Sequence, residues 1–218
     1  MRENTKRSHI FIALLLLAFN AEAWAQSRTA RHTRQVKAFQ AQRERDMRDP
    51  DESALEPADI AKFKHLDYFP ISAAYRVRAH FVRTPDEAKF DMPTSNPKKQ
   101  KRHVKYGELH FKLHGRAWQL NVYQNEALLQ DAKYKSYLFL PFTDETSGKE
   151  TYGGGRYLDL EIPTGDTMTL DFNLAYQPNC AYNHSGRWSC PIPPRENRLP
   201  VAVRAGERLA AKRENIIR

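Results

Sequence analysis

Alternating apolar and polar residues fill the middle of the chain and predict short β-strands. The stretch AYRVRAHFV (74–82) alternates apolar side chains with Arg or His at a two-residue period, as in a half-buried strand. The stretch ELHFKLHGRAWQLNVY (108–123) alternates on both sides of His114-Gly115. This pattern predicts an antiparallel hairpin with its turn at these two residues.

Further strand patterns follow along the chain. The stretch SYLFLPF (136–142) is continuously apolar, which is typical of a strand at the centre of a sheet. RYLDLEI (156–162) and TMTLDFN (167–173) are separated by the turn residues PTGD, and RLPVAVRAG (198–206) ends the series. Roughly seven short strands with little helix between them predict a mostly β fold, either an antiparallel β-sandwich or a barrel.

Residues 1–25 have the pattern of a signal peptide. A positively charged segment (2–7) precedes the apolar run IFIALLLLAF (10–19), and AEAWA supplies the small residues of a cleavage site. The apolar run is shorter than the roughly 20 residues of a membrane-spanning helix, so we expect no transmembrane span. Cleavage after Ala25 would give a periplasmic or secreted bacterial protein that begins at Gln26. An uncleaved membrane anchor is the alternative.

The rest of the chain divides by composition. Residues 26–65 have few large apolar side chains, and those few lie at helical spacing, which predicts a helical, partly disordered lead-in. Residues 66–208 contain the strand patterns and form a β-rich domain that is long enough for one core. Residues 209–218 have the pattern of a short C-terminal helical tail.

The net charge of the chain is +9, and the excess of cationic residues is scattered. Its densest part is KKQKRHVK (98–105), which follows turn residues and is therefore expected to form a solvated loop. Contact with an anionic polymer of the cell envelope is an alternative use of these cations. No aromatic residues alternate with the lysines to stack bases, so we expect no nucleic-acid partner.

Two cysteines, Cys180 and Cys190, lie among turn residues. In a protein destined for an oxidising compartment, such a pair most simply forms a disulfide. A metal site that includes His184 and a pair of free thiols are the two alternatives, although zinc usually needs four ligands and closer cysteines. The other histidines form no ligand cluster, so we expect no metal site there, and the sequence does not identify a cofactor.

The second half of the β-rich domain resembles a known family. The recognisable features are Pro141-Phe142, Asp144, Thr146-Ser147-Gly148, Thr151 to Asp159, Asp171-Phe172-Asn173, Tyr176, Pro178, Cys180, Cys190-Pro191 and Glu196-Asn197. With these motifs the chain resembles the bacterial family called domain of unknown function 1684, over at least residues 69–207. The resemblance implies an exported protein. Members are often lipid-anchored, whereas this chain has no cysteine near the cleavage site, and Gln177 stands where asparagine would fit the family better. The resemblance implies no activity, because the family has none assigned.

The glycine-rich stretch TSGKETYGGGRY (146–157) is the main candidate for a ligand site. Glycines can bring main-chain N–H groups into an anion-binding concavity, and the planar guanidinium of Arg156 suits a carboxylate or phosphate. The alternative is a structural turn in which Arg156 pairs with Asp144, Asp159 or Asp171. On the first interpretation, the ligand-binding residues are Ser147, Thr151, Tyr152, Gly153, Gly154, Gly155, Arg156, Asp171 and Asn173.

Two carboxylates are candidates for acid–base chemistry. A hydrolase could use Asp144 or Asp159 as general base with Arg156 as electrophile. Asp159 and Glu161 share one face of a predicted strand, which is also the pattern of a solvent-facing strand side. No G-x-S-x-G turn is present, so the sequence does not establish that the protein is an enzyme.

The leading functional hypothesis is therefore an exported protein that binds a small anionic or polar ligand at the glycine-rich loop. The hydrolase is one alternative, and a cell-envelope interaction protein that uses residues 98–105 is another. Nothing in the sequence indicates the oligomeric state.

Overall fold

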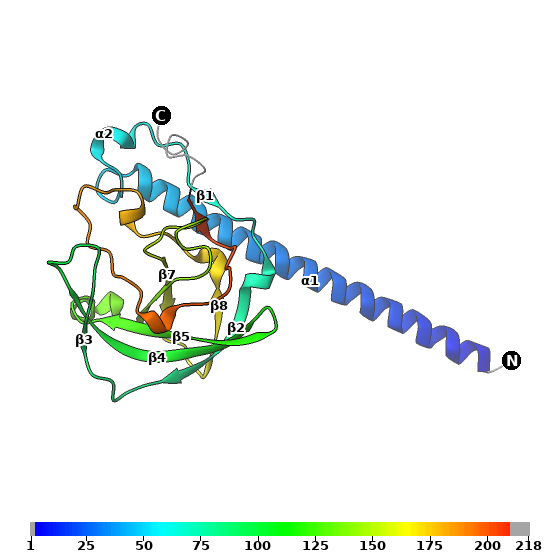
Figure 1. Cartoon of the computed structure of the whole chain (residues 1–218). Coiled ribbons are helices and arrows are strands. Elements are labelled where there is room, and N and C mark those ends of the chain that lie inside the picture. The colour runs from blue at the N-terminus through cyan, green and yellow to red at the C-terminus, as the bar shows by residue number, and fades with distance from the viewer. Residues whose placement is uncertain (1–2, 210–218) are drawn as a thin grey trace. The chain divides into compact units, whose positions relative to one another are not determined.

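The computed structural model describes residues 3–209, with side chains for residues 26–209. The chain divides into two units, Met1–Phe39 and Gln40–Arg218. The first unit consists of the initial part of helix α1 (Glu3–Arg48), which runs without a break past the predicted cleavage site (Figure 1). No helix among the described residues is both long and apolar enough to cross a membrane. Apart from Leu209, the predicted C-terminal tail lies outside the described residues.

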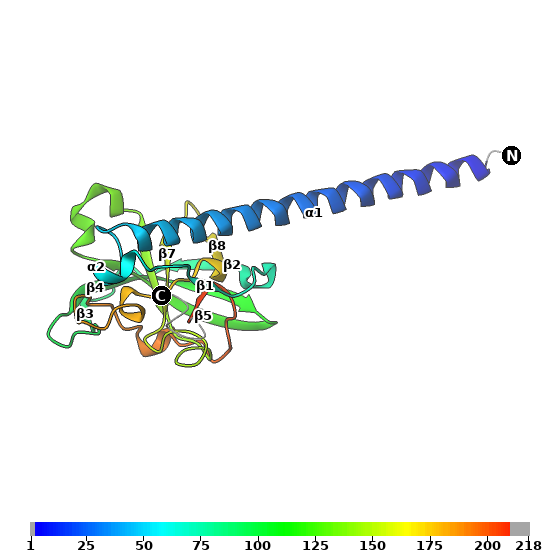
Figure 2. The same cartoon turned by 90° about the horizontal axis from the view of Figure 1, so that it is seen from above.

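The second unit is built on one seven-stranded sheet. The strand order is β7-β6-β5-β4-β2-β8, β3 pairs with β4, and all neighbours are antiparallel. The sheet curls into a half-barrel, and its long β4–β5 hairpin crosses the width of the unit in both views (Figures 1 and 2). The strands are β2 (Arg76–Arg83), β3 (Phe90–Met92), β4 (Lys101–Leu113), β5 (Arg116–Asn125), β6 (Tyr137–Phe142), β7 (Arg156–Glu161) and β8 (Thr167–Asp171).

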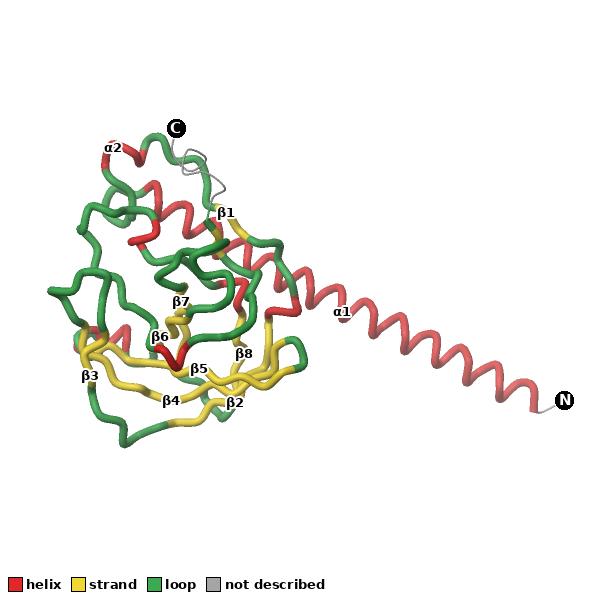
Figure 3. The backbone as a smooth tube through the Cα atoms, in the orientation of Figure 1, coloured by secondary structure: helices red, strands yellow, loops and turns green. Residues whose placement is uncertain are grey.

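Loops and short elements cover one side of this sheet (Figure 3). A separate antiparallel pair joins β1 (Asp67–Tyr68) to β9 (Glu207–Arg208). The remaining helices are α2 (Pro57–Ile60) and the 3-10 turns η1 (Ala73–Tyr75), η2 (Leu128–Gln130), η3 (Ala132–Tyr134), η4 (Phe172–Leu174), η5 (Asn179–Ala181) and η6 (Arg195–Asn197).

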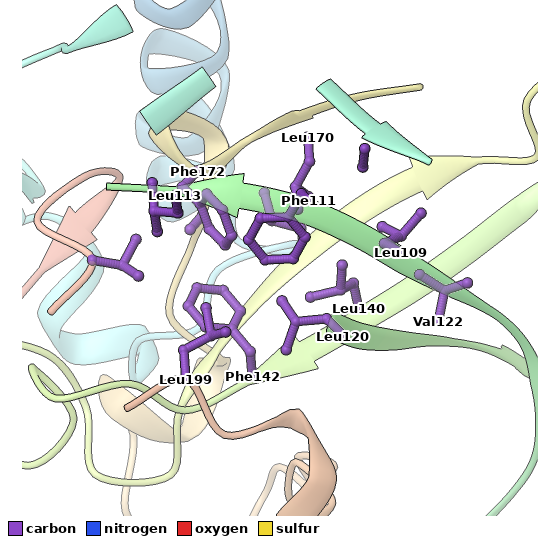
Figure 4. Close-up of a cluster of buried hydrophobic side chains, with 14 of the residues drawn as sticks. Leu109, Phe111, Leu113, Leu120, Val122, Leu140, Phe142, Leu170, Phe172 and Leu199 are labelled. Atoms are coloured by element: carbon purple, nitrogen blue, oxygen red, sulfur yellow. The ribbon is translucent and has the colours of Figure 1, made fainter. Parts of the chain in front are cut away.

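The main hydrophobic core packs against the inner face of the sheet. Three phenylalanine rings meet there, with the centroid of Phe172 5.8 Å from Phe111 and 5.4 Å from Phe142 (Figure 4). Burial of one such ring contributes roughly 1.5–3 kcal/mol. The core is completed from the sheet and from the C-terminal loop by Ala79, Leu109, Leu113, Leu120, Val122, Leu138, Leu140, Leu158, Leu170, Ala175, Leu199, Val203 and Ala205.

These observations confirm the predicted mostly β, antiparallel fold with an N-terminal helix. The hairpin turn lies at His114-Gly115, as expected, with φ values of 51° and 75°. Both values are positive, as a two-residue type I′ turn requires. Of the two architectures left open, the curled single sheet is closer to a barrel than to a sandwich.

One predicted strand is wrong. The stretch RLPVAVRAG (198–206) forms no strand in the described structure. The carbonyls of Val203 and Ala205 accept hydrogen bonds from the side chain of Arg156 instead of from a neighbouring strand. The alternating apolar residues of this stretch are nevertheless used, because Leu199, Val203 and Ala205 enter the core.

The last residues of α1 are anchored within the second unit. Arg48 donates to the carbonyl of Lys64 (2.6 Å), and Glu44 accepts from the main-chain N–H of Leu66 (3.3 Å). A small hydrophobic cluster forms beside them from Met47, Ala54, Leu55, Phe63, Leu66 and Tyr182. This end of the helix is therefore part of the β-rich unit.

A side chain fills a gap between β5 and β6. Within the described sheet these two strands share one register pair, Tyr123 with Phe139. Buried Asn197 accepts from the main-chain N–H of Asn121 (2.8 Å), and its amide donates to the carbonyls of Asn121 (2.8 Å) and Pro141 (2.7 Å). The amide of Asn197 thus takes the place of a strand residue where Pro141 has no N–H to donate.

Candidate functional site

Arg156, the central residue of the predicted anion loop, is fully buried at the start of β7. Its guanidinium donates to the carbonyls of Val203 (2.7 Å), Ala205 and Glu207 (3.3 Å). One guanidinium nitrogen lies 3.5 Å from a carboxylate oxygen of Asp144. Burial lowers the pKa of Arg156, and the charge of Asp144 opposes this change.

Asp144 is buried too, and its carboxylate is held by the loop around it. It accepts hydrogen bonds from the hydroxyls of Thr146 (2.8 Å) and Ser147 (3.2 Å) and from the main-chain N–H of Val203 (2.6 Å). The hydroxyl of Thr151 lies 2.9 Å from that of Thr146. The hydroxyls of Ser147 and Thr151, which were predicted to face a ligand, therefore face Asp144 and Thr146.

The glycines of this loop allow the chain to pack closely on itself. Gly155 has φ of 86°, and a Cβ atom there would lie 2.5 Å from the carbonyl oxygen of Phe142. At Gly154 a Cβ atom would lie 2.4 Å from the ring of Tyr152, whereas at Gly153 the nearest atom would be the Cα of Gly148 at an ordinary contact distance of 3.7 Å. These contacts match the structural alternative, in which Arg156 pairs with Asp144. The buried guanidinium is not accessible to a ligand.

Asp171 and Asn173 are also buried and have partners of their own. Asp171 accepts from the main-chain N–H of Asn173 (3.0 Å) and from its side-chain amide (2.7 Å). Asn173 exchanges two hydrogen bonds with the main chain of Ser72, each of 2.9 Å. These two side chains therefore join the residue before η1 to the end of β8.

Asp159 lies on the opposite face of β7 from Arg156, because strand side chains alternate. It is exposed, and one of its oxygens accepts hydrogen bonds from the hydroxyls of Tyr137 (2.6 Å) and Tyr176 (2.8 Å). The hydrolase alternative needs an accessible carboxylate beside Arg156. Asp144 is beside Arg156 but buried, and Asp159 is accessible but on the other face, so the structure does not assemble that pair.

A hollow lined by aromatic rings adjoins Asp159. Two adjoining hollows, of about 190 and 320 Å³, share Lys101, Tyr157, Tyr176 and Pro191, and we call them together the tyrosine cavity. The first also contains His103, Asn125, Leu128, Tyr137 and Phe139. The second contains Lys99, Pro178, Asn179, Arg187, Trp188, Ser189 and Cys190.

The rings of the tyrosine cavity are held by one another and by hydrogen bonds. Tyr157 packs edge-on against Phe139 (4.8 Å between centroids) and Tyr176 (5.8 Å), and its hydroxyl donates to the carbonyl of Pro191. Arg43, near the end of α1, lies 4.9 Å from the centroid of Tyr176. Burial, and then the charge of Asp159, raise the pKa of the Tyr137 and Tyr176 hydroxyls, so both remain protonated at neutral pH.

Cationic side chains surround the second hollow. Lys99, Lys101 and Arg187 line it, and Arg187 stacks on the ring of Trp188 at 4.8 Å. Burial, and then the charge of Lys99, lower the pKa of the Lys101 ammonium from its ordinary value. An anion bound here would raise the pKa of Lys101 again, because it stabilises the charged form of the lysine.

The lysine run that was expected to form a surface loop is divided between two elements. The prediction is wrong for its second half, since β4 begins at Lys101. Residues 101–103 pair with β3, and this pairing draws His103 into the interior at 1% exposure. The strand thereby places Lys101 and His103 in the wall of the tyrosine cavity.

The two cysteines form the predicted disulfide, with Cα atoms 6.3 Å apart. The bridge closes the loop that supplies Arg187, Trp188 and Ser189 to the second hollow. Ser95 ties this loop to the segment before β4, because its hydroxyl accepts from the main-chain N–H of Cys190 (3.0 Å). In the described part of the chain, His, Cys, Asp and Glu side chains form no group of three or more that could hold a metal ion.

His103 is neutral within this wall. Its Nδ1 lies 2.6 Å from the carbonyl oxygen of Lys101, so we assign the ring proton to Nδ1. Nε2 is then the acceptor for the side-chain amide of Asn125 (3.4 Å). Burial is the largest influence on the pKa of His103 and lowers it below its ordinary value of 6.5.

A larger hollow, of about 910 Å³, lies on the outer face of the sheet. It is lined by residues of β2, β4, β5 and β8, among them Arg78, His80, Lys112 and Trp118. Its polar side chains are partly or largely exposed, as on any solvated strand face. The tyrosine cavity differs because its rings pack on one another and its hydroxyls are held by hydrogen bonds to Asp159 and Pro191.

The fold of this chain is similar to that of a solved structure. A solution NMR structure of an uncharacterised protein of Haloarcula marismortui is similar, with 34% sequence identity and a TM-score of 0.64. The similarity covers 84% of this chain and 97% of that one. The class is therefore a mostly β fold that is shared with an archaeal protein.

The particular family follows from residues 61–208, which match the family described as "Protein of unknown function (DUF1684)". The chain belongs to this family, as its motifs indicated. Comparison with curated proteins found no match.

The burial of Arg156 generates a prediction on stability. We expect Arg156→Lys to lower the free energy of unfolding by about 3–5 kcal/mol, because lysine cannot replace the several donors of the guanidinium and leaves Asp144 poorly paired. Arg204→Lys is the matched control, since Arg204 forms an exposed ion pair with Glu150 and its replacement should barely change stability. Urea denaturation measures both variants. Equal, small effects would contradict a structural role for Arg156.

The buried histidine generates a prediction on pH. Because the pKa of His103 is lowered by folding, the unfolded chain binds a proton at this site below about pH 6.5 while the folded chain does not. Stability should therefore fall as pH decreases through 6.5, and His103→Gln should reduce that slope. Urea denaturation of the unchanged protein and of the variant between pH 7.5 and 5 gives the comparison, and identical slopes in the two proteins would refute the assignment.

Proposed function

We propose that this protein binds a small anionic molecule in the tyrosine cavity. The observation that supports the proposal is that Lys99, Lys101 and Arg187 line one hollow together with the rings of Tyr157, Tyr176 and Trp188. Ligand sites are typically concave and mostly apolar, with a few polar groups that fix orientation. The cations would hold the negative charge, and the rings would exclude water from it.

The size of the cavity limits the ligand. The first hollow, of about 190 Å³, lies below the roughly 300–1,000 Å³ typical of ligand pockets, and the second, of about 320 Å³, lies at the lower end of that range. A molecule of one ring with a charged group is therefore a better match than a nucleotide or another extended cofactor. This proposal keeps the predicted ligand chemistry and moves its site from the loop around Arg156 to the opposite face of β7.

The proposal includes export. The pattern of residues 1–25 supports it, and a disulfide beside the cavity suits an oxidising compartment. A ligand taken up outside the cytoplasm would meet the protein after the bridge has formed.

Binding is tested with Lys101→Gln. Loss of a charge-assisted hydrogen bond costs about 1.5–3 kcal/mol, so the affinity for a small carboxylate should fall roughly tenfold to a hundredfold. Lys112→Gln is the control, because Lys112 lies near the other end of the same strand, away from the cavity. Thermal shift identifies a binding acid among benzoate, glucuronate and phosphate, and calorimetry measures its affinity. A similar loss in both variants would place the anion elsewhere.

Export predicts the mass of the mature chain. When the full-length protein is produced in a bacterium, the periplasmic form should begin at Gln26, because signal peptidase cleaves after small residues such as Ala25. Intact-mass spectrometry of the periplasmic fraction checks this. A full-length chain retained in the cytoplasm or in the inner membrane would refute it, and replacement of Ala25 by a bulky residue should block the cleavage.

A further inference from the structure

We propose that the ligand of the tyrosine cavity is a ring-shaped acid that has several hydroxyl groups, which is the chemistry of a sugar acid. The inference rests on the proposed function, which accounts for the acidic group. It adds the hydroxyl groups at the other end of the ligand and the residues that accept hydrogen bonds from them.

The two tyrosine hydroxyls of the first hollow are acceptors toward a ligand, whereas Lys101 and the amide of Asn125 in the same hollow carry donors. Tyr137 and Tyr176 each have one hydroxyl proton, and both protons are donated to the same oxygen of Asp159. Each hydroxyl can therefore act toward a ligand through its lone pairs alone. A ligand group that contacts these two hydroxyls has to bring donors of its own.

His103 contributes a further hydrogen-bond acceptor to the first hollow. Its ring proton lies toward the carbonyl of Lys101, so the nitrogen that remains, Nε2, is an acceptor. Its present partner, the amide of Asn125, lies at 3.4 Å, which is long for a hydrogen bond. A hydroxyl group of a ligand could donate to this nitrogen.

The second hollow has the opposite character. Lys99, Lys101 and Arg187 line it, and each of them donates hydrogen bonds and accepts none. Because Lys101 and Tyr176 line both hollows, a single small molecule can reach both kinds of group. The cavity thus selects for donors at one end of the ligand and for a negative charge at the other.

Aromatic rings lie between the two ends. Tyr157 lines both hollows, and Phe139 packs against it at 4.8 Å between centroids. The C–H groups of a sugar ring form an apolar face that can pack on such rings. A benzoate-like acid could pack there too, but it would cover the acceptors of the first hollow without donating to them, and unpaired buried polar groups oppose binding.

The test compares three probes on the mature chain by calorimetry. Glucuronate provides the acid and the hydroxyls, glucose provides the hydroxyls, and benzoate provides a ring with the acid. We expect glucuronate to bind at least tenfold more tightly than either of the others. Tyr137→Phe should weaken glucuronate binding roughly threefold to tenfold by removing one acceptor, while benzoate should bind at least as tightly as before, because it loses an acceptor that it leaves unpaired.

A matched variant controls for changes in packing. Tyr134 lies beside Tyr137, with ring centroids 5.9 Å apart, but does not line the cavity, so Tyr134→Phe should leave the binding of all three probes unchanged. Benzoate that binds as tightly as glucuronate, or a Tyr137→Phe variant with unaltered selectivity, would overturn the inference and leave the anion site in place. Glucose that binds as tightly as glucuronate would instead overturn the proposed anion site. A failure of all three probes would overturn both.

Discussion

The buried positive charge of Arg156 determines the path of the C-terminal segment through the β-rich unit. Removing a guanidinium from water is costly unless its donors are satisfied, and Arg156 obtains partners from Asp144 and from three carbonyls near the end of the chain. The C-terminal segment must therefore run past the start of β7 in a conformation that turns those carbonyls inward. This requirement explains why residues 198–206 pack into the core without forming a strand.

The same charge decides which face of β7 is available for binding. Side chains alternate along a strand, so a buried Arg156 places Tyr157 and Asp159 on the other face. There they meet Tyr176, from the loop after β8, and Tyr137, from β6. The glycine-rich loop and the tyrosine cavity are thus two sides of one strand, and the loop supports the cavity without contributing its predicted residues to it.

Local periodicity predicted the sheet and the hairpin at His114-Gly115, because alternation and turn chemistry depend on neighbours in sequence. The disulfide was predictable too, because the chain contains only two cysteines and they lie close together in the sequence. Pairing of Arg156 with Asp144 was one of the two predicted roles, but the sequence could not decide between them, since the carbonyl partners of Arg156 lie about fifty residues further along the chain. The tyrosine cavity could not be predicted either, because its lining residues come from segments that are far apart in the sequence. One clue was present: Tyr157 shares the face of Asp159 and Glu161 by the same two-residue period.

The side-chain bridge of Asn197 between β5 and β6 has a consequence for the order in which the protein is made. Synthesis proceeds from the N-terminus, and both strands leave the ribosome more than fifty residues before Asn197 does. Until then the carbonyl of Pro141 and the main chain of Asn121 lack their final partners, and Arg156 lacks its carbonyls. The sheet therefore remains incomplete until residues 197–207 are available to it, and the native fold is reached only after this segment has joined the rest of the unit.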